Sequence, residues 1–224
     1  MNKLFSTIIF LLFVAVLDAA PVETRFSMGA IVLGAKQSAY QVGGDQVLKE
    51  LRIRTHIDPK DQNAWKWLTE KTLEKSPPFL WIVIGNRAKI TPELVSGLQR
   101  FLFSGGTVLV EAERSHQAQF VLGELRKKVF YKKKITVVKD KELITRTYYI
   151  LPKTTANTLK TIKYSDRILW IESNVPILTH VKPHYSSTRE TAIRTAINVV
   201  LYTLTGSYKD DLTHLKYLMR RKKY

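Results

Sequence analysis

A run of six apolar residues, Phe79–Ile84, constrains the fold of this chain more than any other feature. A strand with apolar side chains on both faces must be covered on both faces, as in the middle of a mainly parallel sheet. Thr107–Val110 has the same character and follows a helical pattern that begins at Thr91-Pro92 and ends at Gly105-Gly106. The chain therefore needs helices on both sides of a sheet.

Apolar runs and helical patterns alternate along most of the chain, which indicates βαβ units. We expect further strands over Phe26–Leu33, Ile53–Ile57, Ile135–Val138, Thr145–Leu151 and Arg167–Glu172. We expect further helices from Gly43-Gly44-Asp45, from Asp58-Pro59 to Ser76, over Gln117–Lys128 and from Thr188 to Gly206. One doubly wound α/β domain with a mostly parallel sheet and helices on both faces is the economical interpretation.

The N-terminus has the pattern of a secretory signal peptide. Lys3 precedes an apolar run of about 14 residues, shorter than the roughly 20 that span a bilayer. Ala19-Ala20 before Pro21 offers small residues to signal peptidase. We expect residues 1–20 to be a signal peptide, 21–207 an α/β domain and 208–224 a basic tail, in an exported, periplasmic protein that is soluble or peripheral. A retained membrane anchor is the alternative.

The charge of the chain indicates anionic partners. Lys and Arg number 36 against 19 Asp and Glu, a formal net charge of +17, which governs association and solubility rather than fold. The candidates for contact with an anionic surface are Lys132, Lys133, Lys134, Arg220, Arg221, Lys222 and Lys223. Nearby aromatic residues would also suit nucleic acid, but export separates the protein from it. An anionic membrane surface or an unknown envelope protein is the favoured partner, and a solvated basic surface is the alternative.

Carboxylates at the end of a predicted strand are the main candidates for a ligand site. Glu111 and Glu113 follow Thr107–Val110, and ligands of open α/β sheets bind outside the carboxyl ends of the strands. Being two residues apart, they face the same side and could bind a cation or act as acid and base. Alternatively, they pair with basic neighbours. The ligand-binding candidates are Glu111, Glu113, Asn86, Arg87, Arg146 and Arg167.

Several chemistries are disfavoured. The chain has no cysteine, which excludes disulfides, thiolate nucleophiles and thiolate metal ligands. Ser115-His116 lacks the glycines of a nucleophile elbow. His180 and His184 have a zinc-ligand spacing, but Pro183 between them argues against a helix. We therefore assign no catalytic residue, no metal and no cofactor, favour a protein that is not an enzyme, and leave a small-molecule ligand open.

Four segments resemble one family of bacterial exported proteins. They are Pro78–Gly85, Leu98–Glu111, Arg167–Ser173 and, most specifically, Ala196–Gly206. Over Arg25–Lys222 the chain is similar to domain of unknown function 4159. The resemblance implies a flavodoxin-like fold of the class I glutamine amidotransferase type.

The family pattern has paired aspartates where this chain has Glu111-Ala112-Glu113, and an Asp-His-Pro stretch where it has Asp140-Lys141-Glu142. The resemblance therefore implies that any chemistry at these positions is altered here. Amidotransferase chemistry also needs a cysteine nucleophile, which is absent. We expect a non-catalytic exported domain for binding or assembly that associates with an anionic surface. The alternative is a hydrolase or cation-dependent enzyme with Glu111 and Glu113 as its site.

Overall fold

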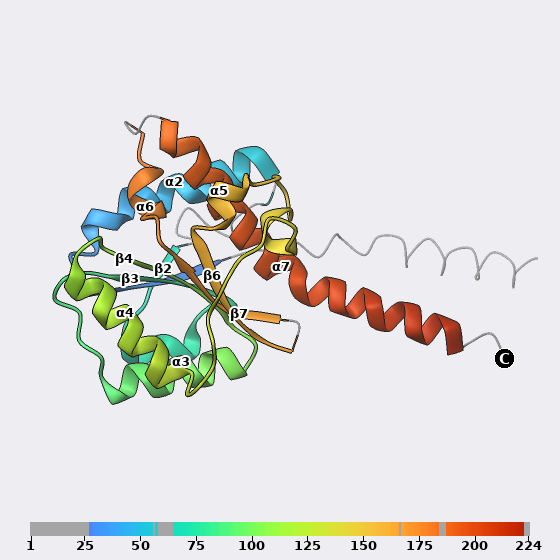
Figure 1. Cartoon of the computed structure of the whole chain (residues 1–224), viewed down its shortest axis with the longest axis horizontal. Helices are drawn as coiled ribbons and strands as arrows, with labels where there is room; N and C mark the ends of the chain where they lie inside the picture. Colours follow the sequence, from blue (N-terminus) through green and yellow to red (C-terminus); the bar gives the residue numbers. More distant parts are fainter. Residues whose placement is uncertain (1–26, 56, 58–64, 166, 184–186, 222–224) are drawn as a thin grey trace, which may run out of the picture.

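The computed structural model describes residues 27–55, 57, 65–165, 167–183 and 187–221. Within them, seven strands form one sheet in the order β2-β1-β3-β4-β7-β6-β5 (Figure 1). The strands are β1 (Met28–Leu33), β2 (Trp65–Trp67), β3 (Phe79–Ile84), β4 (Thr107–Ala112), β5 (Thr136–Val137), β6 (Leu159–Tyr164) and β7 (Arg167–Ser173). The expected signal peptide, residues 1–20, lies outside the described residues, as do Lys222 and Lys223.

Strands β2, β1, β3, β4 and β7 run parallel, and β6 and β5 extend the sheet in antiparallel fashion. Read along the sheet, the five parallel strands follow the 2-1-3-4-5 order of flavodoxin-like folds. The expected α/β class with a mostly parallel sheet is therefore confirmed, and the topology is consistent with a flavodoxin-like fold.

Helices cover both faces of the sheet (Figure 1). The helical elements are α2 (Ser38–Thr55), η1 (Glu70–Lys75), α3 (Pro92–Phe103), α4 (His116–Val129), η2 (Leu143–Thr145), α5 (Lys153–Ala156), α6 (Ile177–His180) and α7 (Ser187–Arg221). Helices α2, α6 and α7 enclose one hydrophobic core, and η1, α3 and α4 enclose the other. Along β3, Trp81 faces the first core and Ile82 the second. All six residues of β3 are buried, as its sequence predicts.

Helix α2 corrects two expectations. The expected strand over Ile53–Ile57 is wrong, because α2 continues to Thr55, and Gly43-Gly44 lie inside this helix rather than at its start. A Cβ at Gly43 would lie 2.0 Å from the carbonyl oxygen of Leu178 in α6. Gly43 thus permits close packing between two helices, a role that its local sequence does not distinguish from a helix cap.

The expected helix from Asp58-Pro59 to Ser76 is also wrong where the structure describes it. Trp65–Trp67 forms β2, which pairs with β1, and only Glu70–Lys75 is helical, as a 3-10 turn. The rings of Trp65 and Trp81 lie 5.7 Å apart. Strand β1 lies between β2 and β3, so these two rings pack on the same face of the sheet across β1. This packing outweighs the helical spacing in the segment.

The last third of the chain differs from expectation in three places. Thr145–Leu151 is not a strand but an irregular segment after η2, and β6 was not expected. Helix α7 does not end at Gly206; it continues to Arg221, and its last part extends away from the sheet (Figure 1). No helix in the described part of the chain is both long and apolar enough to cross a membrane.

One buried amide holds the irregular segment in place. Asn198 of α7 is fully buried. Its Oδ1 accepts hydrogen bonds from the backbone N–H groups of Tyr148 (3.3 Å) and Tyr149 (2.8 Å). Its Nδ2 donates to the carbonyl oxygens of Ile144 (3.2 Å) and Tyr149 (2.8 Å). This side chain thus replaces the strand partners that the segment lacks.

Asn198→Ala should destabilise the protein by about 3 kcal/mol, because buried backbone groups would lose their partners. The matched change Asn157→Ala, at an exposed position, should cost less than about 0.5 kcal/mol. Urea unfolding measures both. Equal small losses in the two variants would show that the amide does not hold the segment.

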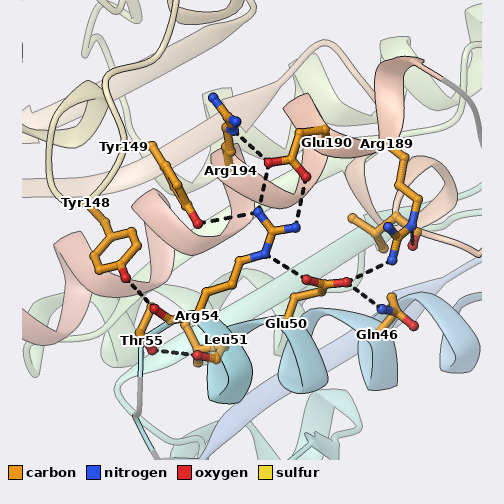
Figure 2. Close-up of polar contacts among 11 residues, drawn as sticks. Gln46, Glu50, Leu51, Arg54, Thr55, Tyr148, Tyr149, Arg189, Glu190 and Arg194 are labelled. Atoms are coloured by element: carbon orange, nitrogen blue, oxygen red, sulfur yellow. Dashed lines mark hydrogen bonds and ion pairs between the residues drawn. The ribbon is translucent and has the colours of Figure 1, made fainter.

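An ion-pair network joins α2 to α7 (Figure 2). The Arg54 guanidinium donates to both carboxylate oxygens of Glu190, at 2.8 and 2.9 Å, and to Glu50 at 2.7 Å. Arg189 donates to Glu50 at 2.9 Å, and Arg194 donates to Glu190 at 2.7 Å. The pKa of Glu190 is lowered to about 2, mainly by its hydrogen bonds from Arg54.

The network should make stability fall in acid. A carboxyl whose pKa is lowered by folding stabilises the protein above its unfolded pKa, and this contribution is lost as pH falls through the folded value. For Glu190 the window runs from about pH 4.5 down to about 2. Because this side chain is partly exposed, we expect Glu190→Gln to cost only about 1 kcal/mol at pH 7.

That cost should shrink toward zero near pH 2 in urea unfolding. Glu93→Gln, at an exposed position on α3, is the matched control and should change stability little at either pH. If Glu190→Gln lowers the free energy of unfolding equally at pH 7 and pH 2, folding does not lower the pKa of Glu190.

Candidate functional site

The switch point of the sheet, where ligands of such folds usually bind, is filled by backbone. The loops that follow β1 and β3 bond to each other: Gly85 N–H donates to Leu33 O at 2.7 Å, and Arg87 N–H to Gly34 O at 3.2 Å. Gly34 has φ of +68°, and a Cβ there would lie 1.9 Å from the nitrogen of Ala88. The two loops therefore leave no room between them for a ligand.

Glu113, after β4, is bound by neighbouring groups. Its carboxylate accepts a hydrogen bond from the Tyr40 hydroxyl of α2 at 2.8 Å and one from the Asn86 N–H at 3.1 Å. The pKa of the Tyr40 hydroxyl is raised, mainly by burial and to a smaller extent by its hydrogen bond to Glu113. The Ser115 hydroxyl contacts the Asn86 side chain and caps α4 by accepting from Ala118 N–H. Glu113 thus connects α2 to the loop after β3.

Glu111 is enclosed more completely. It is 1% exposed, and both of its carboxylate oxygens lie 3.3 Å from the N–H of Leu178. Burial raises the pKa of Glu111 to about 8, so its carboxyl is mostly protonated at neutral pH. The two glutamates lie on the same side of β4, as expected, but internal donors occupy both of them.

The structure places the six ligand-binding candidates in three locations. Asn86, Arg87, Glu111 and Glu113 lie together at the carboxyl edge of the parallel strands, with Arg87 exposed. Arg146 lies after η2, where its Nε donates to Asp140 O at 3.2 Å. Arg167 begins β7 at the opposite edge and donates to the carbonyl oxygens of Gly105 and Gly106. Arg146 and Arg167 are therefore not part of a shared site with the glutamates.

Sequence reasoning missed a cavity of about 310 Å³ at the carboxyl end of β7. Its lining is rich in hydroxyl groups and consists of Arg114, Thr154, Thr155, Thr158, Ser173, Val175, Ile177, His180, Thr188, Thr191, Ala192 and Thr195. Burial, together with the charge of Arg114, lowers the pKa of His180. The spacing of Thr188, Thr191 and Thr195 on one helix face was a usable signal.

A second hollow, of about 710 Å³, lies beside β1 and η1. Gln37, Thr69, Glu70, Lys71 and Glu93 supply its polar lining. No group of three or more His, Asp or Glu side chains suited to a metal ion occurs among the described residues. His184, the expected companion of His180, lies outside them.

The sequence profile of the domain of unknown function DUF4159 matches residues 28–204. The chain belongs to this family. The DUF4159 region runs from β1 into α7 and includes the glutamates, the cavity and Asn198. A search of curated proteins finds no match to the chain.

Glu111→Gln tests whether this carboxyl is protonated in the folded DUF4159 domain. A group whose pKa rises on folding, here from 4.5 to about 8, makes the protein lose stability as pH rises between these values. The variant should resemble the wild type at pH 5 and be more stable than it by up to a few kcal/mol near pH 8. Urea unfolding across pH 5–9 measures the difference. If the stability of the variant relative to the wild type falls between pH 5 and pH 8, the Glu111 carboxyl is not protonated in the folded protein.

Proposed function

We propose that this protein is a non-catalytic, exported binding domain that attaches to an anionic membrane surface through one end of its sheet. The contact surface, here called the basic aromatic patch, consists of Phe103, Tyr131, Lys132, Lys133, Lys134 and Tyr164. Bacterial export and an amidotransferase-like ancestry of the fold, both implied by the family resemblance, are part of the same proposal.

The observation that carries this proposal is the interleaving of exposed rings and ammonium groups. Tyr131 is 79% exposed, Phe103 68% and Tyr164 55%. Lys133 Nζ lies 5.2 Å from the ring centre of Tyr164, which in turn packs edge-on against Phe103. Exposed rings beside lysines suit a membrane interface, where the ring enters the headgroup region and the ammonium meets phosphate.

The patch gathers three elements at one edge of the domain. Phe103 ends α3, the lysines follow α4, and Tyr164 ends β6 next to the first residue of β7. This is the amino-terminal edge of the parallel strands, opposite the glutamates. Among the described residues, the ion pairs do not include Lys132, Lys133 or Lys134. Their charges are therefore available to an anionic surface.

The internal bonding of Glu111 and Glu113 supports a binding function over the hydrolase or cation-dependent alternative. A cation site or a general base needs an accessible carboxylate, whereas Glu111 is buried and Glu113 is bonded to Tyr40 and Asn86. Arg220 and Arg221 fall at the end of α7, beyond the part whose side chains are described. Their contribution to surface binding, with that of Lys222 and Lys223, stays a prediction.

Cosedimentation with vesicles tests the proposal. The chain lacking residues 1–20 should bind vesicles that contain phosphatidylglycerol and not vesicles of phosphatidylcholine alone. Changing Lys132, Lys133 and Lys134 together to Gln should weaken binding by up to about 3 kcal/mol, at roughly 1 kcal/mol per residue. Raising the salt concentration should weaken binding of the unchanged chain, because exposed charges are screened over about 8 Å at physiological ionic strength.

The control is the charge-matched triple change of Lys36, Lys49 and Lys89 to Gln, at exposed positions outside the patch. It should leave vesicle binding nearly unchanged. Equal weakening by the two triple changes would mean that net charge alone attracts the protein, and the patch would have no specific role.

A further inference from the structure

The cavity at the carboxyl end of β7 has an unusual balance of groups. Hydroxyl side chains, Arg114 and His180 share its lining with the apolar Val175, Ile177 and Ala192, and no Asp or Glu is among these described lining residues. A volume of about 310 Å³ lies at the lower end of the range of roughly 300–1,000 Å³ for small-molecule sites. The cavity therefore suits a small ligand rather than a peptide or a nucleic acid.

The charge at the cavity is positive. Arg114 is exposed at the rim, and no ion pair among the described residues includes it. Its charge acts on the buried imidazole of His180. Behind the lining residue Ile177, the carboxyl of Glu111 is mostly protonated at neutral pH and contributes little negative charge. An anion at this position would meet a cation without first displacing a carboxylate.

Six of the seven lining hydroxyl groups are of two kinds. Thr158 Oγ1 donates to Thr155 O at 2.7 Å, Ser173 Oγ to Val175 O at 2.7 Å and Thr195 Oγ1 to Thr191 O at 2.8 Å. These three hydroxyls have used their protons, and the Ser173 oxygen also accepts from the Val175 N–H at 3.2 Å. Any bond that they make to a ligand must therefore be one that they accept. Thr154, Thr188 and Thr191 are exposed at the rim and can rotate to donate. A ligand with both an oxyanion and a hydroxyl or amino donor would satisfy both kinds.

We propose that this cavity is a binding site for a small organic oxyanion, a carboxylate or a phosphate ester. Arg114 and the rim threonines hold the oxyanion, and the apolar part of the ligand packs on Val175, Ile177 and Ala192. The site goes beyond the proposed membrane attachment and does not depend on it, because the cavity and the basic aromatic patch lie at opposite edges of the sheet.

Threonine-methyl NMR of the purified protein tests this site with three probes: phenyl phosphate, benzoate and benzyl alcohol. Saturable shifts should appear at the methyl groups of the cavity threonines with one or both anions and not with the neutral alcohol. A response to phenyl phosphate alone identifies the ligand class as a phosphate ester, and a response to benzoate alone identifies it as a carboxylate.

Arg114→Gln should weaken binding of the responding anion at least about tenfold, as expected for loss of a charged hydrogen bond. Arg87→Gln is the matched control, since Arg87 is exposed at the same edge of the sheet but does not line the cavity. It should change the affinity less than about twofold. An equal loss in both variants would assign the binding to the net charge of the protein and overturn the site.

A second variant tests the cavity itself. Thr191→Phe places a ring at an exposed, cavity-lining position of α7, so circular dichroism should show an intact fold while binding is abolished. Wild-type affinity in this variant, or the absence of saturable shifts at the cavity threonines up to about 10 mM of either anion, would overturn the proposal.

Discussion

Strands β3, β4 and β7 have almost no solvent-facing side, so a carboxyl group that they carry must either be paired or be neutral. The carboxylate of Glu172 in β7 accepts hydrogen bonds from the Arg126 guanidinium, at 2.8 and 2.9 Å. It also accepts one from the Trp170 indole N–H at 2.9 Å. Glu111 makes no ion pair with the described residues, and burial raises its pKa to about 8, so this carboxyl is neutral rather than paired. The same constraint thus produces an ion pair on one face of the sheet and a neutral acid on the other.

Glu111 also determines where α6 lies. Its carboxyl contacts the N–H of Leu178, while the carbonyl oxygen of the same residue occupies the space that Gly43 leaves open in α2. This short helix is therefore held between the central strand and α2, and it brings Ile177 and His180 to the cavity. Because the loops after β1 and β3 bond to each other across the usual crevice, the two hollows lie to its sides, one beside β7 and the other beside β1 and η1.

The features that the sequence predicts are those determined by local chemistry. Thr91-Pro92 before an apolar helical pattern gives α3 with the expected cap, since the Thr91 hydroxyl accepts from Leu94 N–H at 3.1 Å. The continuous apolar runs give β3 and β4. The role of Gly43, in contrast, depends on Leu178, about 135 residues away in the chain, and a local pattern does not show this contact.

The candidate site was only partly predictable for the same reason. The strand-end position brought Asn86, Arg87 and the two glutamates together, but their bonding to Tyr40 and Leu178 depends on helices that pack from elsewhere. The threonines of α7 are visible in the sequence at i, i+3 and i+7. What the sequence could not show is that α5, α6 and the end of β7 leave a cavity in front of them.

The two proposed surfaces are separated by the length of the strands. A strand of six residues, such as β4, spans roughly 20 Å at about 3.3 Å per residue. Parallel strands place all their starting points, and hence the basic aromatic patch, at one edge, and all their carboxyl ends, with the cavity, at the other. A domain resting on a membrane by the patch would therefore present its cavity to the surrounding solvent. In that orientation a small anion could reach Arg114 without competing with phospholipid headgroups for the same cations.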